Sequence, residues 1–233
     1  MNIAIIAAAG QGRRLGGKRA KQFLELAGVP LIIHTLKKFE QCPAIQEVVV
    51  VLPAPDVDGF LALARGYDLH KVVRVVPGGE TRGDSVGRAL QTVSPETTEI
   101  VAVHDGVRPF VTPEEIERTV CAAQTSGAAI LTAPVVDTIK VVENDRVART
   151  LERAELRRAL TPQCFRYELL RRAFEQSLEV IARATDDSSL VEALGATVTI
   201  VEGNPLNIKI TGPEDIILGE IFLKSLESDV EAK

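Results

Sequence analysis

The chain has few cysteines, and they form no metal-binding or disulfide pattern. Cys42, Cys121 and Cys164 are the only three in 233 residues, and they are widely spaced without a C-x-x-C pair. This spacing argues against a zinc ribbon and against a disulfide framework. We therefore expect each cysteine to act as a small buried hydrophobic residue in a reducing compartment, which predicts a cytoplasmic protein.

The chain also lacks an excess of positive charge and any long apolar run. Its formal net charge is −5, so no broad basic surface for nucleic acid is predicted. No apolar run approaches the roughly 20 residues of a membrane span. The apolar stretch at the N-terminus is short, has no basic region before it and ends in a basic loop. We interpret it as a core strand rather than a signal peptide.

Strand-like and helix-like segments alternate through the first half of the chain. This rhythm predicts an α/β fold with a doubly wound, mostly parallel, Rossmann-like sheet, whose ligands bind at the carboxyl ends of the strands. The length allows one sizeable domain or two small ones, and we expect a single domain over residues 1–233. The expected strands begin at Ile3 and cover 47–52, 71–76, 99–103 and 128–133, and the expected helices begin at Pro30 and cover 56–65, 82–93 and 113–126.

The alternation breaks at Val135. Residues 135–142 and 147–151 form two strand-like segments on either side of a polar turn, Glu143-Asn144-Asp145-Arg146. This pattern predicts a β-hairpin that is too short to be a domain, so we expect an arm over about 135–153 that projects from the sheet. The elements expected after it are helices at 155–160, 167–183 and 186–194, strands at 197–201 and 207–210, and a closing helix from Pro213.

The loop after the first strand carries glycines and two arginines, which suits phosphate binding. Leu15 stands where a dinucleotide fingerprint needs its third glycine, and Arg19 stands where a Walker loop needs a hydroxyl. The remaining match is a nucleotidyltransferase loop, in which Arg14 is followed by Lys21. The alternative is a solvated basic loop that binds no ligand.

Further polar clusters follow other strands. Residues 77–85 form either a nucleotide-binding turn or an ordinary helix cap. Asp105 ends a buried strand, so it needs a cation, a metal or hydrogen-bond donors. It forms either a structural ion pair with Arg108, or contacts a nucleotide's magnesium or ribose while Arg108 faces a phosphate. We interpret His104 as a scaffold histidine. The pair at 186–187 is either a metal site or, more simply, the acidic start of a helix.

Eight motifs occur in order: AAAGQGRR, KQF, GGETRGDS, HDGVRPF, PVVDTIK, LTPQCF, TDDSSLVEALG and NIKIT. With them the chain resembles the 2-C-methyl-D-erythritol 4-phosphate cytidylyltransferase family. The resemblance implies an enzyme that transfers CMP from CTP to 2-C-methyl-D-erythritol 4-phosphate (methylerythritol phosphate below), with Mg²⁺ or another divalent cation. The departures, Ala20 for a frequent proline and Gly106-Val107 for a frequent alanine pair, remove no functional group.

The resemblance also implies roles for particular positions. Arg14 and Lys21 would stabilise the transition state, and Arg153 and Lys209 would position the phosphate of methylerythritol phosphate for attack. Mg²⁺ would be held mainly by the CTP phosphates, with Asp105 as a candidate ligand. The arm would interlock two subunits into a homodimer, so that Thr138 and Arg153 serve the neighbour's site. The implied CTP-binding residues are Ala8, Ala9, Gly10, Gln11, Gly12, Gly79, Glu80, Ser85, Asp105 and Gly106, and the implied further substrate-binding residues are Arg108, Thr138 and Thr161.

The implied chemistry agrees with the residue types. The nucleophile is a phosphate monoester, largely dianionic at neutral pH because its second pKa is about 6. No catalytic base is needed, and the difficulty is to neutralise two polyanions with cations. The closest rival is a cytidylyltransferase for another polyol phosphate, such as ribitol 5-phosphate. A non-catalytic nucleotide-binding module is a rival of another class, against which the pair Arg14 and Lys21 argues.

Overall fold

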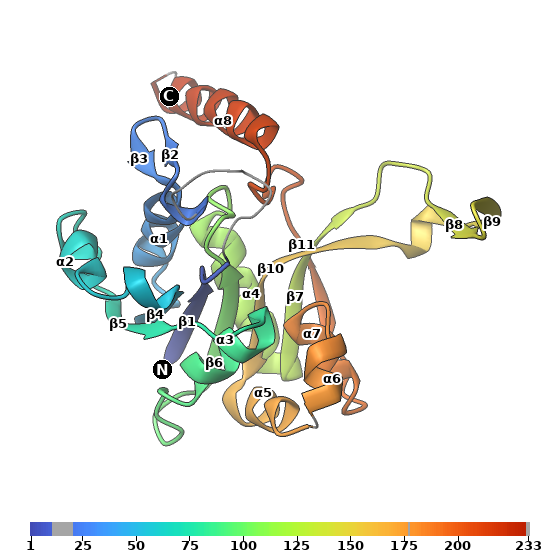
Figure 1. The fold of residues 1–233 in the computed structure, drawn as a ribbon, viewed down its shortest axis with the longest axis horizontal. Helices are drawn as coiled ribbons and strands as arrows, with labels where there is room; N and C mark the ends of the chain where they lie inside the picture. The colour runs from blue at the N-terminus through green and yellow to red at the C-terminus, as the bar shows by residue number, and fades with distance from the viewer. Residues whose placement is uncertain (11–20, 177, 232–233) are drawn as a thin grey trace.

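A seven-stranded sheet forms the centre of the computed structural model, which describes residues 1–10, 21–176 and 178–231 (Figure 1). The strands lie in the order β11–β7–β10–β6–β1–β4–β5. Neighbouring strands are parallel, except that β10 is antiparallel to both β6 and β7. The strands are β1 (Asn2–Ala7), β4 (Glu47–Leu52), β5 (Val72–Pro77), β6 (Ile100–Asp105), β7 (Ala128–Pro134), β10 (Arg157–Arg166) and β11 (Thr199–Glu202).

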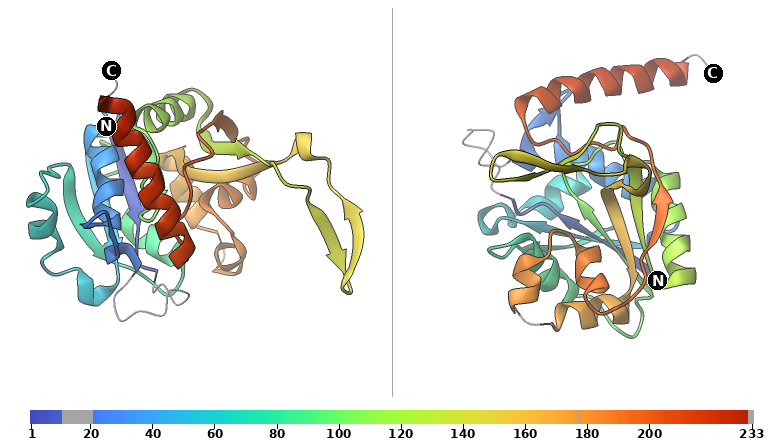
Figure 2. Two further views of the ribbon diagram at one scale, coloured as in Figure 1. Left: turned by 90° about the horizontal axis from the view of Figure 1, so that it is seen from above. Right: turned by 90° about the vertical axis from the view of Figure 1, so that its right-hand side faces the viewer.

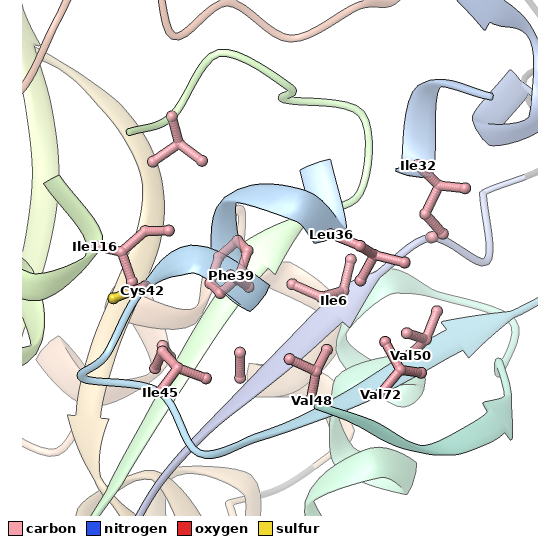
Figure 3. Close-up of a cluster of buried hydrophobic side chains, with 14 of the residues drawn as sticks. Ile6, Ile32, Leu36, Phe39, Cys42, Ile45, Val48, Val50, Val72 and Ile116 are labelled. Atoms are coloured by element: carbon pink, nitrogen blue, oxygen red, sulfur yellow. The ribbon is translucent and has the colours of Figure 1, made fainter. Parts of the chain in front are cut away.

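Helices cover both faces of this sheet because its central strands are apolar on both faces. Ile6 of β1 belongs to a core cluster with Phe39 and Ile116 (Figure 3), whereas Ile5 belongs to a second cluster on the opposite face. The first face is covered by α1 (Leu31–Gln41), α2 (Phe60–Arg65) and α4 (Pro113–Ser126), and the second by α3 (Arg82–Leu90), α5 (Tyr167–Phe174), α6 (Leu178–Arg183) and α7 (Asp187–Glu192). The predicted α/β architecture with a mostly parallel sheet is confirmed.

The last helix, α8 (Pro213–Glu231), lies above the small hairpin of β2 (Glu25–Leu26) and β3 (Val29–Pro30) (Figure 1). Phe222 packs edge-on against Phe110, with ring centroids 5.5 Å apart. These contacts enclose Ile210, which is fully buried in a third small core cluster. They anchor the end of the segment that carries Lys209. No helix among the described residues is long and apolar enough to cross a membrane.

The predicted arm is present as the hairpin of β8 (Lys140–Glu143) and β9 (Arg146–Thr150). Its turn residues Asn144 and Asp145 both have positive φ, as a tight hairpin turn of the mirror-image type requires. The hairpin stands away from the sheet (Figures 1 and 2). Val136, in the segment that leads into β8, is 74% exposed. Within one chain the arm therefore packs against little of the domain.

The structure corrects several predictions in the second half of the chain. Residues 155–160 are not a helix: after one 3-10 turn, η4 (Arg153–Glu155), the chain enters β10. Proline is unusual inside a central strand, so the presence of Pro162 argued against a strand here. In the structure a register shift between Ala159 and Gln163 accommodates this proline. The predicted helix over 167–183 is divided into α5 and α6, and the segment 207–210 is not a strand.

Candidate active site

A cavity of about 480 Å³ opens at the carboxyl ends of β1 and β6. The segments that follow β1 and β6 lie side by side here, because the Gly106 amide donates to the Ala7 carbonyl. The Ala8 amide donates in turn to the Val51 carbonyl of β4. The cavity therefore lies where the alternating pattern predicts a ligand. Its lining includes these predicted residues: Ala8, Ala9, Gly10, Lys21, Gly79, Glu80, Ser85, Asp105 and Lys209.

Two glycines let the loops around the cavity approach each other. A Cβ atom on Gly78 would lie 2.2 Å from the Cβ of Ala9, and one on Gly106 would lie 2.8 Å from the Cβ of Ala8. Neither contact is tolerable, so both positions need glycine for the backbone to pass this closely. Gly106 thus lies directly against Ala8 of the cavity wall and is not itself among the lining residues.

The loop before α3 is fixed by its own side chains. Thr81 caps α3 by accepting from the Asp84 amide, while Asp84 accepts in return from the Thr81 amide, which is a capping box. Ser85 donates to the Thr81 carbonyl and accepts from the Gly79 amide at 3.0 Å. The segment 77–85 contains a helix cap and also lines one wall of the cavity, so its being a cap does not exclude nucleotide binding.

Three cations converge on Asp105 at the end of β6. Its Oδ1 lies 3.2 Å from Nε of Arg82, and its Oδ2 lies 3.2 Å from Nε of Arg108 and 2.9 Å from Nζ of Lys209. Burial raises the pKa of the Asp105 carboxyl, but the Arg82, Lys209 and Arg108 cations outweigh burial and hold it well below its ordinary value. The ion pair with Arg108, one of the two alternatives that the sequence left open, is present, and Asp105 stays ionised among three positive charges.

A buried polar scaffold holds this cluster in place. Thr161 of β10 accepts a hydrogen bond from the Asp105 amide, and its hydroxyl lies 2.9 Å from Nδ1 of His104. The Asn207 side-chain amide donates to the Thr161 backbone carbonyl, while the Asn207 backbone carbonyl accepts from Arg108. Thr161 therefore lies behind Asp105 as support, and the segment that carries Lys209 is tied to both β6 and β10.

His104 is a scaffold histidine, as predicted, because it is fully buried with both ring nitrogens in hydrogen bonds to Thr161 and to the Arg108 carbonyl. Burial lowers its pKa to about 3. Its folded-state pKa lies below its unfolded value, so the unfolded chain binds a proton between about pH 6.5 and pH 3 that the folded chain does not. Folding stability is therefore lost as the pH falls through that window.

We expect His104 alone to account for a loss of about 2 kcal/mol of unfolding free energy between pH 7 and pH 5. Urea unfolding of the wild type and of His104→Gln at both pH values measures this contribution. The variant should be less stable at pH 7 and lose less on acidification. Equal losses in the two proteins would contradict the assignment.

The two predicted residues of the arm lie apart from the cavity. Arg153 is exposed and donates to the Val136 carbonyl at 2.8 Å, and Thr138 is exposed near the base of the arm. Neither lines the cavity of its own chain. The predictions for Gln11, Gly12 and Arg14 fall outside the described residues.

Sequence reasoning assigned no role to Arg82 or Gln163, and it considered Asp187 only as part of an acidic pair that is either a metal site or a helix start. In the structure Arg82 bridges Asp105 and Asp187, and Gln163 holds the backbone at the start of α7. All three residues belong to motifs quoted above, but no local pattern revealed these contacts. The predicted helix start at 186–187 is confirmed, because Asp186 caps α7 by accepting from the Ser189 amide.

The described residues form no cluster of three or more histidine, cysteine or acidic side chains that would enclose a metal ion. Asp105 is the acidic residue closest to such a role, and both of its oxygens face cations. Mg²⁺ typically binds one or two carboxylates together with substrate phosphates. The donor set therefore suits a metal that arrives with a nucleotide rather than one held by protein side chains.

Comparisons with known proteins identify the family to which the chain is similar. A family model described as 2-C-methyl-D-erythritol 4-phosphate cytidylyltransferase matches residues 2–225. A protein of that name from Bacillus cytotoxicus is 44% identical over 223 residues, which cover 96% of this chain and 98% of the relative. Another from Acidobacterium capsulatum is 44% identical over 235 residues, covering 97% of this chain and 98% of the relative.

Solved structures give the same result. The crystal structure of 4-diphosphocytidyl-2C-methyl-D-erythritol synthase from Anaerococcus prevotii superposes with a TM-score of 0.85 at 33% identity, covering 96% of each chain. The 2-C-methyl-D-erythritol 4-phosphate cytidylyltransferase of Thermus thermophilus superposes with a TM-score of 0.77 at 35% identity, covering 95% of this chain and 98% of that one.

Proposed function

Because this chain belongs to the 2-C-methyl-D-erythritol 4-phosphate cytidylyltransferase family, we propose that the cavity at the ends of β1 and β6 is its active site. The enzyme is a nucleotidyltransferase that moves CMP from CTP to methylerythritol phosphate. Its products are 4-diphosphocytidyl-2-C-methyl-D-erythritol and pyrophosphate. The observation that carries the proposal is the convergence of Arg82, Arg108 and Lys209 on Asp105 at the wall of this cavity.

The proposed CTP site is the part of the cavity between the first loop and the start of α3. Ala8, Ala9 and Gly10 present small side chains and backbone there, which suits the approach of a triphosphate. Glu80 and Ser85 also line this part of the cavity, where hydrogen-bonding groups can recognise base and ribose. Gln11 and Gly12 continue the triphosphate loop in this proposal, and Gly106 packs against Ala8 at the start of that loop.

The proposed methylerythritol phosphate site lies at the Asp105 cluster. Arg108 and Lys209 supply positive charge, and Asp105 keeps both cations in place before the substrate arrives. A phosphate oxygen of the substrate then attacks the α-phosphorus of CTP in line, and the bond to pyrophosphate breaks. No proton must be removed from the attacking oxygen, which is consistent with the buried, neutral state of His104.

The charge that accumulates in this displacement must be neutralised. Lys21 lines the cavity and, with Arg14, is proposed to stabilise the transition state. A divalent cation such as Mg²⁺, bound mainly by the CTP phosphates and secondarily by Asp105, would further offset the charge on the departing pyrophosphate.

The arm supports a homodimer as the working unit. Val136, Val142 and Val147 expose large apolar side chains there, 74%, 59% and 62% exposed respectively, which is costly unless a second surface covers them. Thr138 and Arg153 lie on the same arm, outside the cavity of their own chain. We therefore assign them to the site of the partner subunit. The free cysteines among the described residues, Cys42, Cys121 and Cys164, support a cytoplasmic location. Cys42 and Cys164 are buried as predicted, whereas Cys121 is exposed, so the prediction that every cysteine is buried is wrong for Cys121.

The Asp105→Asn variant tests the assignment of the site. It leaves Arg82, Arg108 and Lys209 without the carboxylate that holds them, so kcat/KM for methylerythritol phosphate should fall by about 100-fold, or about 2.7 kcal/mol. Steady-state pyrophosphate release measures this ratio, and circular dichroism checks that the variant folds. Glu115→Gln is the matched control, since Glu115 is an equally buried acid that caps α4 outside the cavity. If Asp105→Asn loses no more activity than this control, the assignment is wrong.

A further inference from the structure

A chain of ion pairs leads from the proposed substrate site into the protein interior. Arg82 contacts two carboxylates at once: its Nε lies 3.2 Å from Oδ1 of Asp105, and its Nη1 lies 2.8 Å from Oδ2 of Asp187. The Arg82 side chain lines the cavity, whereas that of Asp187 is only 1% exposed. Asp187 therefore reaches the cavity only through Arg82.

The carboxylate of Asp187 is not needed to form the helix on which it lies. The neighbouring Asp186 already caps α7, and Gln163 of β10 accepts hydrogen bonds from the Asp187 and Ser188 amides, both at 3.0 Å. Burying an acid is costly unless its charge is paired, and for Asp187 the pairing group is Arg82. The acid is thus placed, by a rigid backbone, where its charge acts on one guanidinium group.

The position of that guanidinium matters for the cluster beyond it. Arg82 occupies Oδ1 of Asp105, which leaves Oδ2 to face Arg108 and Lys209. If Arg82 were free to turn toward the cavity, Oδ1 would lose its partner and the Asp105 carboxylate could rotate. The two cations proposed to receive the substrate phosphate would then lose their common anchor.

We infer that Asp187 is a positioning residue of the active site: it holds Arg82 against Asp105, and so keeps Arg108 and Lys209 oriented toward the phosphate of methylerythritol phosphate. The inference rests on the proposed function of this cluster. It also gives the acidic pair at 186–187 two separate tasks, with Asp186 stabilising the helix and Asp187 orienting the site.

The isosteric variant Asp187→Asn tests this role because it removes the charge and keeps the shape. It should raise KM for methylerythritol phosphate about tenfold, equivalent to about 1.4 kcal/mol, with KM for CTP changed by less than about twofold. Arg82→Gln should produce the same pattern. The double variant should be no worse than Arg82→Gln alone, because residues that act through one another are not additive.

Asp186→Asn is the matched control, since asparagine also caps helices and this residue does not contact Arg82. It should leave both KM values within about twofold of the wild type. If Asp187→Asn fails to fold, Arg82→Lys replaces it: lysine keeps the charge but cannot span both carboxylates, so KM for methylerythritol phosphate should again rise alone.

Two outcomes would overturn the inference. One is an equal increase in KM for methylerythritol phosphate and for CTP, and the other is a KM increase in the double variant equal to the product of the two single increases. Lys209→Gln separates this failure from a failure of the proposed function. If Lys209→Gln raises KM for methylerythritol phosphate and Asp187→Asn does not, only the role of Asp187 is wrong. If neither variant raises it, the substrate site itself is misplaced.

Discussion

A heterodimer assembled from two inactive variants, Lys209→Ala and Arg153→Ala, is expected to recover about half of the wild-type activity. Each proposed site takes Lys209 from one subunit and Arg153 from the arm of the other. In the mixed dimer one site therefore has both residues intact, and the other has neither. The heterodimer can be prepared by co-expression with two different affinity tags, and its activity measured as pyrophosphate release.

The alternative arrangement gives a sharply different result. If Arg153 served its own chain's cavity, neither site of the heterodimer would be complete and no activity would return. The matched controls are the two homodimers, each prepared by co-expressing one variant with both tags, and both should stay inactive. An inactive heterodimer, from single variants that are themselves inactive and dimeric, would contradict the assignment of the arm to the partner's site.

Lys21→Ala is expected to reduce kcat by about 10²- to 10³-fold, with KM for CTP changed by less than about threefold. Lys21 lines the cavity, and a cation whose interaction with the substrates strengthens as the transition state forms affects turnover more than binding. The same result is predicted for Arg14→Ala from the sequence. Steady-state kinetics with CTP as the varied substrate separates the two constants.

Arg65→Ala provides the control for loss of one positive charge, since Arg65 is exposed on α2 and does not line the cavity. Its kcat should equal that of the wild type. If Lys21→Ala lowered CTP affinity by the same factor as turnover, Lys21 would contribute to binding of the nucleotide in the ground state as well as in the transition state. Its proposed role in the transition state would then be wrong.

The sequence predicts the first half of the fold well because its patterns are local. The strand at 47–52 is apolar throughout after Glu47, and the helix over 113–126 begins with Thr112 as its cap and Pro113 in its first turn. The sequence does not predict β10, because pairing with β6 and β7, and not a local pattern of residues, makes this segment a strand. Its first three residues are exposed and Pro162 interrupts it, so only its place between β6 and β7 identifies it as a strand.

The sequence predicted which residues form the site better than it predicted the contacts between them. Asp105, Arg108 and Lys209 were each selected from their motifs, and the structure places them within ion-pair distance. Their link through Arg82 to Asp187 joins residues 105 positions apart in sequence, and no local pattern reveals such a contact. The arm gives the opposite case: the sequence motifs selected Thr138 and Arg153, but the structure of one chain does not bring them to the cavity. They can reach a site only if a second subunit is present.

Pyrophosphate release from CTP and Mg²⁺ with alternative polyol phosphates tests the central claim most directly. The purified protein should release pyrophosphate rapidly with 2-C-methyl-D-erythritol 4-phosphate and far more slowly with ribitol 5-phosphate, and Lys209→Gln should abolish the preference by weakening the first reaction. Activity with ribitol 5-phosphate but not with methylerythritol phosphate would contradict the account.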